Sequence, residues 1–253
     1  MCTVSWSGGR GGYDLFFNRD ELNTRSPESP PAAAQENGVN FVAPRDGDRG
    51  GTWLLANEFG LTVCLLNDYS SVWRPSATGG RFSRGHVVLA CAVATDHASV
   101  TDIANRQPLP RTPAFHLVVL SPDEGPLVLH WDGSGLARRD IAASRPLLSS
   151  SSYETAGVIA MRTARFDAMV RSPSKPAIKE LAAFHRQHEQ DAGAYSVLMR
   201  RTDAATRSIT HVAVRDGGVR LRYEPACWAE RGPLAPEPVQ LNLPQRRRPA
   251  LTA

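Results

Sequence analysis

The sequence predicts an α+β fold in which antiparallel strands outnumber the helices. Short apolar runs bounded by Gly, Pro, Asp and Ser recur along the chain, a pattern typical of strands. Several neighbouring runs are separated by only a short turn signal, so we expect hairpins rather than strand–helix–strand crossovers. Helical periodicity is confined to a few segments, which are long enough to cover the sheets.

Ten strands are expected from these apolar runs. They lie at 2–6, 12–19, 51–56, 60–66, 86–93, 115–120, 126–131, 194–200, 207–214 and 218–223. Turn signals join three pairs of them, at residues 8–12, at 57–60 and at 216–218.

Helices are expected at 98–105, 157–171 and 176–189. In the last segment Ile178, Leu181, Ala182 and His185 fall on one helical face, and Pro176 suits a first turn.

The chain of 253 residues is 42% hydrophobic, enough for one sizeable core, and we expect one domain over residues 1–231. Residues 22–38 are rich in Pro, Ser, Ala and Asn and are interpreted as a long surface loop. Residues 232–253 are rich in Pro and Arg and are expected to be a disordered tail outside the fold.

The net charge of +4 comes from scattered arginines, so we expect no nucleic-acid partner. No apolar run approaches the roughly 18 residues of a membrane span, and no secretory signal pattern is seen. A cytoplasmic location is therefore expected. Cys64 and Cys91 lie in apolar runs and are interpreted as buried thiols of a reducing compartment.

Several sequence signals are better explained by structure than by chemistry. The Gly-rich segment 8–12 precedes a strand, so it is a hairpin turn and no dinucleotide fingerprint. His185 and His188 have helical spacing without an acidic partner, which favours an exposed helix face over a zinc site. His116, His130 and His211 lie in strand-like runs and are interpreted as structural histidines. No metal and no cofactor are expected.

Cys2 is the candidate nucleophile because it directly follows Met1. A small residue at this position permits removal of the initiator methionine, which leaves Cys2 with a free α-amine. Reference pKa values are about 7.7–8.0 for that amine and about 8.5 for a thiol, so the amine can accept the thiol proton near neutral pH. One residue then supplies both nucleophile and base.

The charged run Asn18-Arg19-Asp20-Glu21 ends the second expected strand, and the hairpin returns it to the side of Cys2. There Asp20 can hold the α-ammonium and Arg19 can stabilise a thiolate. In a regular strand the two side chains point to opposite faces, so both cannot face Cys2 unless a bulge intervenes. A solvated charged turn is the alternative interpretation.

Asn67 ends a buried strand, and its amide is a suitable donor to an oxyanion; a strand-end turn residue is the alternative. The charged loop with Arg45, Asp46, Asp48 and Arg49 can line the mouth of a pocket or form a plain Asp-Gly turn.

Four blocks in this order resemble the NRDE-motif family, whose eukaryotic relatives are called transport and Golgi organisation protein 2. They are MCTVSW, NRDE at 18–21, APRDGDRGGTW at 43–53 and NEFGLTVCLLN at 57–67. Weaker similarity at 149–155 and 195–214 extends the resemblance along the body of the chain.

The resemblance implies an Ntn-hydrolase-like fold, a four-layer αββα sandwich of two antiparallel sheets flanked by helices. By position it implies a catalytic set of Cys2, Arg19, Asp20 and Asn67. Beside this set, we expect substrate-binding roles for Asn18, Arg45, Asp46, Trp53 and Ser150. Ser150 lies in a run of four serines where the family often has an Asn that serves as a second oxyanion donor.

Two functions are expected as alternatives. The first is a cysteine amidohydrolase acting on a linear C–N amide bond of a small molecule, in the manner of distant relatives such as the choloylglycine hydrolases and penicillin V acylases. The second is a non-catalytic protein of the same fold that binds a hydrophobic, lipid-like or haem-like ligand in trafficking or homeostasis. A homo-oligomer is compatible with either.

Overall fold

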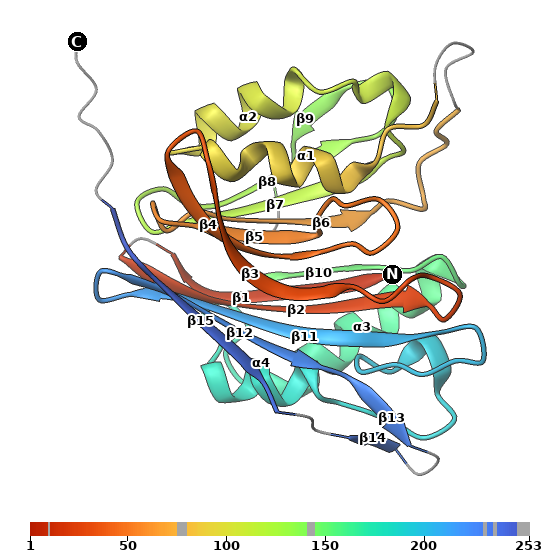
Figure 1. Cartoon of the computed structure of the whole chain (residues 1–253). Coiled ribbons are helices and arrows are strands. Elements are labelled where there is room, and N and C mark those ends of the chain that lie inside the picture. Colours follow the sequence, from red (N-terminus) through yellow and green to blue (C-terminus); the bar gives the residue numbers. More distant parts are fainter. Residues whose placement is uncertain (10, 75–79, 141–144, 230–231, 235–236, 247–253) are drawn as a thin grey trace.

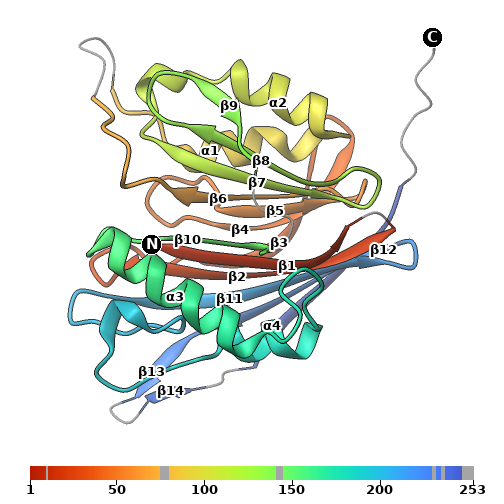
Figure 2. The same cartoon turned by 180° about the vertical axis from the view of Figure 1, so that it is seen from behind.

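The computed structural model describes the chain except for residues 10, 75–79, 141–144, 230–231, 235–236 and 247–253. Two antiparallel sheets lie face to face, and a pair of helices covers the outer face of each (Figure 1). Figure 2 shows the same four layers from behind. The predicted αββα sandwich is confirmed.

The first sheet holds both ends of the described chain. In spatial order its strands are β10 (Leu147–Ser150), β1 (Cys2–Gly9), β2 (Gly12–Leu22), β11 (Ala204–Arg215), β12 (Gly218–Pro225) and β15 (Val239–Pro244). Strand β1 lies between β10 and β2, so Cys2 has a backbone neighbour on each side: Ser150 on β10 and Arg19 on β2.

The second sheet is a meander in chain order. Its strands are β3 (Ser29–Glu36), β4 (Val39–Arg45), β5 (Leu54–Asn57), β6 (Thr62–Asn67), β7 (Phe115–Ser121), β8 (Gly125–Trp131) and β9 (Leu136–Arg138). A separate small ribbon pairs β13 (Cys227–Ala229) with β14 (Gly232–Leu234).

Helices α1 (Arg84–Ala90) and α2 (His97–Asn105) lie against the second sheet, and α3 (Thr155–Met169) and α4 (Ile178–His185) lie against the first (Figures 1 and 2). Helix α2 begins at a capping box, in which Asp96 accepts from the Ser99 N–H and the Ser99 side chain accepts from the Asp96 N–H. Of the described helices, none combines the length and apolar character needed to span a bilayer.

Strand β2 shows how alternation divides the core. Its odd-numbered residues Tyr13, Leu15 and Phe17 pack between the two sheets, while Phe16 packs against the helices α3 and α4. The same alternation must therefore send Arg19 toward the second sheet and Asp20 toward the helices.

Two expected strands are wrong. The apolar run at 86–93 forms most of α1 and a short 3-10 turn, because a helix buried against a sheet can be apolar over consecutive residues. The run at 194–200 begins with another 3-10 turn, Gly193–Tyr195, and forms only an isolated bridge through Arg200.

Two segments expected to be irregular contain strands. Within 22–38 lies β3, an edge strand, where proline is tolerated because one side of the strand needs no hydrogen-bond donors. Within 232–253, β15 pairs with β12, and Val239, Leu241 and Leu243 pack on the core between the sheets. The rest of that expected tail includes 235–236 and 247–253, which lie outside the described residues.

Candidate active site

Cys2 lies at the start of β1 and is 8% exposed. Its backbone nitrogen donates to Ser150 Oγ at 3.1 Å. Burial raises the pKa of the Cys2 thiol, against the neighbouring α-amine, the Asp20 N–H and Arg19, which lower it. The thiol is therefore protonated near neutral pH and needs a base to become a nucleophile.

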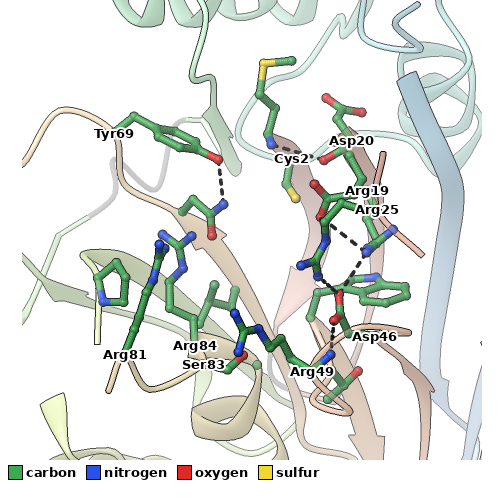
Figure 3. Close-up of a pocket in the computed structure, with 18 of the residues that line it drawn as sticks. Cys2, Arg19, Asp20, Arg25, Asp46, Arg49, Tyr69, Arg81, Ser83 and Arg84 are labelled. Carbon is green, nitrogen blue, oxygen red and sulfur yellow. Dashed lines mark hydrogen bonds and ion pairs between the residues drawn. The ribbon is translucent and has the colours of Figure 1, made fainter. Parts of the chain in front are cut away.

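A cavity of about 390 Å³ opens beside Cys2. Figure 3 shows the Cys2 sulfur directed into it, with arginines on both sides of the opening. The residues that line it come from both sheets, from the loops that leave their strands, and from the segment 81–85 that leads into the first turn of α1. Of the predicted site residues, the lining includes Cys2, Arg19, Asp20, Asp46, Trp53 and Asn67.

Arg19 pairs directly with Cys2 across β1 and β2, so the two side chains share the face between the sheets. Its guanidinium contacts Glu28 at 3.1 Å and Asp46 at 3.2 Å and lies 4.2 Å from the centre of the Trp53 ring. Glu21 lies 3.4 Å from the same guanidinium, so Arg19 is held by three acids and an aromatic face, and it forms one wall of the cavity.

The carboxylate of Asp20 points away from the cavity, toward the helices. It accepts from Thr206 Oγ1 at 2.7 Å and pairs with Arg162 at 3.1 Å. Only the backbone of Asp20 reaches the chain terminus, where its carbonyl accepts from the Met1 amine at 3.2 Å. Arg19 and Asp20 therefore do point to opposite faces of the sheet, as strand alternation predicts. The irregular pairing beside them lies in β11, between Thr206 and Ser208, so it does not turn the two side chains of β2 to one face.

Asn18 lies on the helix side of β2 and is fully buried. Its amide nitrogen donates to the carbonyls of His185 and Val197, and its oxygen lies 2.8 Å from His185 Nδ1. Asn18 therefore anchors α4 to the sheet and is not part of the cavity, contrary to its expected substrate-binding role. The expectation that His185 lies on an exposed helix face is also wrong, since its side chain is fully buried.

Asn67 projects into the cavity from the end of β6, and its amide donates to the Tyr69 hydroxyl at 2.7 Å. An amide nitrogen carries two donor hydrogens, so one remains for a bound group. The position suits the expected oxyanion donor.

Of the two neighbouring residues Arg45 and Asp46 at the end of β4, only Asp46 lines the cavity. Its carboxylate binds Arg19 and Arg25 and accepts from the Arg49 N–H. Burial opposes the charge of Asp46, but these donors outweigh it and lower the pKa of the carboxyl. Arg45 instead donates to the Gly50 carbonyl and does not line the cavity.

Arg81 and Arg84 lie on the opposite side of the opening from Arg25 and Asp46 (Figure 3). Arg84 donates to the Ala114 carbonyl, and burial lowers its pKa to about 10, with Arg81 acting in the same direction. Among the described residues neither arginine has a carboxylate within ion-pair distance. This wall therefore presents uncompensated positive charge.

Sequence reasoning missed Arg162, the largest fully buried side chain among the described residues. It donates to Thr3 Oγ1 at 2.6 Å, to Asp20 and to the Ala194 carbonyl. A signal existed: Arg162 shares a helical face with Val158 and Phe166, and an arginine on an apolar face requires a partner.

The sandwich of two antiparallel sheets flanked by helices, with a cysteine at the start of the interior strand β1, is an Ntn-hydrolase-like fold. The chain belongs to the Transport and Golgi organisation 2 family, whose sequence profile matches residues 1–223. No curated protein sequence matches it significantly.

Solved structures share this fold at low identity. The C2A variant of conjugated bile acid hydrolase from Clostridium perfringens is 12% identical, with a TM-score of 0.58 and full coverage of both chains. Penicillin V acylase from Agrobacterium tumefaciens is 12% identical, with a TM-score of 0.55 over 88% of this chain and 82% of the acylase. An N-acylethanolamine-hydrolyzing acid amidase ortholog from Caenorhabditis elegans is 11% identical, with a TM-score of 0.54 over 83% and 92% of the two chains.

Proposed function

We propose that this protein is a cysteine amidohydrolase that cleaves the C–N amide bond of a small molecule bearing an anionic group. The observation that carries the proposal is the position of Cys2: its sulfur faces the cavity, and its nitrogen is held by Ser150. The fold shared with three amide-cleaving enzymes supports it. The four described cysteines are free, in keeping with the cytoplasmic location that we also propose.

The chemistry begins with removal of Met1, which frees the Cys2 α-amine. The amine accepts the thiol proton as Sγ attacks the carbonyl carbon of the amide. The carbonyl oxygen takes the negative charge, and the Asn67 amide is placed to donate to it. Collapse of this intermediate breaks the C–N bond, and the leaving nitrogen takes the proton back from the ammonium. The products are a thioester on Cys2 and a free amine.

Water then completes the reaction. The Cys2 amine takes a proton from water as the hydroxide attacks the thioester carbonyl. The C–S bond breaks, the sulfur recovers the proton, and a carboxylic acid leaves. In this scheme Ser150 orients the α-amine, while Asp20 and Arg162 fix the start of β1 from the helix side through Thr3.

The charge of the side chains that line the cavity supports the proposal that the substrate is anionic. Arg19 and Arg25 are compensated by Asp46 and Glu21, but Arg81 and Arg84 face the same space without an acid partner among the described residues. A carboxylate, sulfonate or phosphate on the substrate would supply that partner through charge-assisted hydrogen bonds. A purely apolar ligand would leave these charges unpaired.

The test combines processing, reactivity and turnover. Intact mass should show loss of Met1, and iodoacetamide at neutral pH should label Cys2 faster than the exposed Cys227. A panel of N-acyl amino acids, each with its uncharged methyl ester as the matched control, should release amine preferentially from the carboxylates. Cys2→Ala should abolish release. Retention of Met1, or labelling of Cys2 no faster than Cys227, would overturn the proposal.

One observation favours a second candidate, a non-catalytic binding protein. Met1 is 8% exposed and packs against Val158, Met199 and Ala204, and its sulfur accepts from Ser151. A chain that keeps this residue is well packed and has its Cys2 amine blocked. Such a protein would bind an anionic ligand in the same cavity without turnover, and the mass measurement separates the two cases.

A further inference from the structure

A cluster outside the cavity brings together a carboxylate and two imidazoles. Asp68 directly follows β6, His116 lies in β7 and His130 lies in β8. One potential ligand atom from each residue lies within 4.8 Å of the other two. None of the three lines the cavity beside Cys2.

The register of the second sheet creates this cluster. His116 and His130 are directly paired across β7 and β8, and their rings stack with centroids 4.3 Å apart. Both alternate with Val118 and Val128, which pack between the sheets, so both rings face inward. Asp68 reaches them from the neighbouring strand end, where its Oδ2 lies 2.8 Å from His130 Nε2.

The surroundings hold the carboxylate in one orientation. Asp68 accepts from the Ser70 backbone N–H and from the hydroxyls of Ser70 and Ser71. Hydrogen bonds of this kind, from groups behind a ligand, orient carboxylates in metal sites.

His116 supplies the second, independent observation. The residue is 7% exposed, and its Nδ1 has no hydrogen-bond partner among the described residues. Buried ring nitrogens are ordinarily paired, so an unpaired one calls for a group that the protein itself does not supply. Packing explains the stacked rings, but it does not explain a polar atom left without a partner.

We infer that Asp68, His116 and His130 bind a divalent transition-metal ion of the zinc class. Two imidazoles and one carboxylate suit Zn²⁺ and its neighbours in the first transition row, whereas Ca²⁺ and Mg²⁺ prefer oxygen ligands throughout. Three protein ligands leave a coordination position for water or another small ligand. This inference does not depend on the amidohydrolase proposal.

The direct test is equilibrium dialysis of the untagged chain against micromolar Zn²⁺, with bound metal measured by mass spectrometry. The protein should carry Cys2→Ala and Cys227→Ala, because an N-terminal cysteine can itself chelate zinc. We expect about one zinc ion per chain. Asp68→Asn, His116→Asn and His130→Asn should each lose it.

His211→Asn is the matched control. His211 also pairs with an aspartate, Asp14, at 2.7 Å and stacks on Phe16, but among the described residues no third His, Cys, Asp or Glu completes a metal-binding group with this pair. Its zinc content should equal that of the parent. Circular dichroism and thermal melts establish that every variant is folded.

A second measurement uses the parent, which is the chain with Cys2→Ala and Cys227→Ala and an unchanged cluster. Co²⁺ bound to it should show visible d–d absorption without a thiolate charge-transfer band, since no sulfur belongs to the site. Absence of bound Zn²⁺ and Co²⁺ from the folded parent would overturn the inference. So would zinc binding that survives in all three cluster variants.

Discussion

Asp20 and Arg162 form an ion pair at 3.1 Å in which both side chains are completely buried. The pair joins β2 to α3, and Arg162 also donates to Thr3 on β1. It therefore ties the two strands nearest the candidate nucleophile to the helix layer behind them. Asp20 belongs to the charged run that the sequence places beside Cys2, yet its carboxylate acts on the far face of the sheet.

Removing one partner of this pair should be costly. Arg162→Met leaves the Asp20 carboxylate buried without a cation, and we expect it to lower the free energy of unfolding by about 3–5 kcal/mol. Arg165→Met, on the same helix, removes only a partly exposed ion pair with Glu189 and should cost less than about 1 kcal/mol. Urea denaturation measures both. Equal effects of the two changes would contradict a dominant role for the buried pair.

Acid should destabilise the protein partly through His185. Burial lowers its pKa to about 3, whereas an unfolded histidine has a pKa near 6.5. Between these values the unfolded chain binds a proton that the folded chain does not. The histidine costs no stability above about pH 6.5 and destabilises the fold progressively as the pH falls toward 3, by up to about 1.4 kcal/mol per unit.

Urea unfolding between about pH 6.5 and 4.5 tests this sign. His185→Gln should flatten the fall in stability with acid. Ser5→Ala removes a hydrogen-bond partner at 2.8 Å but keeps the imidazole, so its slope should match that of the parent. An unchanged slope in His185→Gln would show that other groups govern the acid response.

Ser150 and Ser149 offer a matched pair on β10. Ser150 Oγ accepts from the Cys2 nitrogen, whereas Ser149 Oγ lies 3.2 Å from Thr3 Oγ1. If Ser150 orients the freed α-amine, Ser150→Ala should slow iodoacetamide labelling of Cys2 by roughly tenfold, the value of one hydrogen bond to a charged group. Ser149→Ala should label at close to the parent rate. Equal rates in both variants would remove Ser150 from the proposed chemistry.

The sequence was informative where local pattern decides the outcome. Alternation correctly predicted that Arg19 and Asp20 cannot both face Cys2. It could not say which of them does, because the answer depends on which side of the sheet the helices cover. The helix-side partner of Asp20 is Arg162, which is 142 residues away in the chain and beyond the reach of local periodicity.

The errors have similar physical causes. The apolar run before Cys91 fits a buried helix as well as a buried strand, and only the sheet beneath it decides. Strands β3 and β15 are edge strands, so they tolerate the prolines that made their segments resemble loops. Arg81 and Arg84 belong to no recognisable sequence motif. Only the folded structure shows that both line the cavity.

Those two arginines give a prediction about substrate charge. Arg81→Met should raise KM for an anionic amide by roughly tenfold, as expected for loss of one charge-assisted hydrogen bond, and leave the uncharged methyl ester unaffected. Arg84→Met should act in the same direction. Arg45→Met is the control, because Arg45 is the last residue of β4, directly before Asp46, and does not line the cavity. Steady-state kinetics with the matched pair of substrates measures the difference, and an equal rise for both members would mean that the arginines shape the cavity without recognising charge.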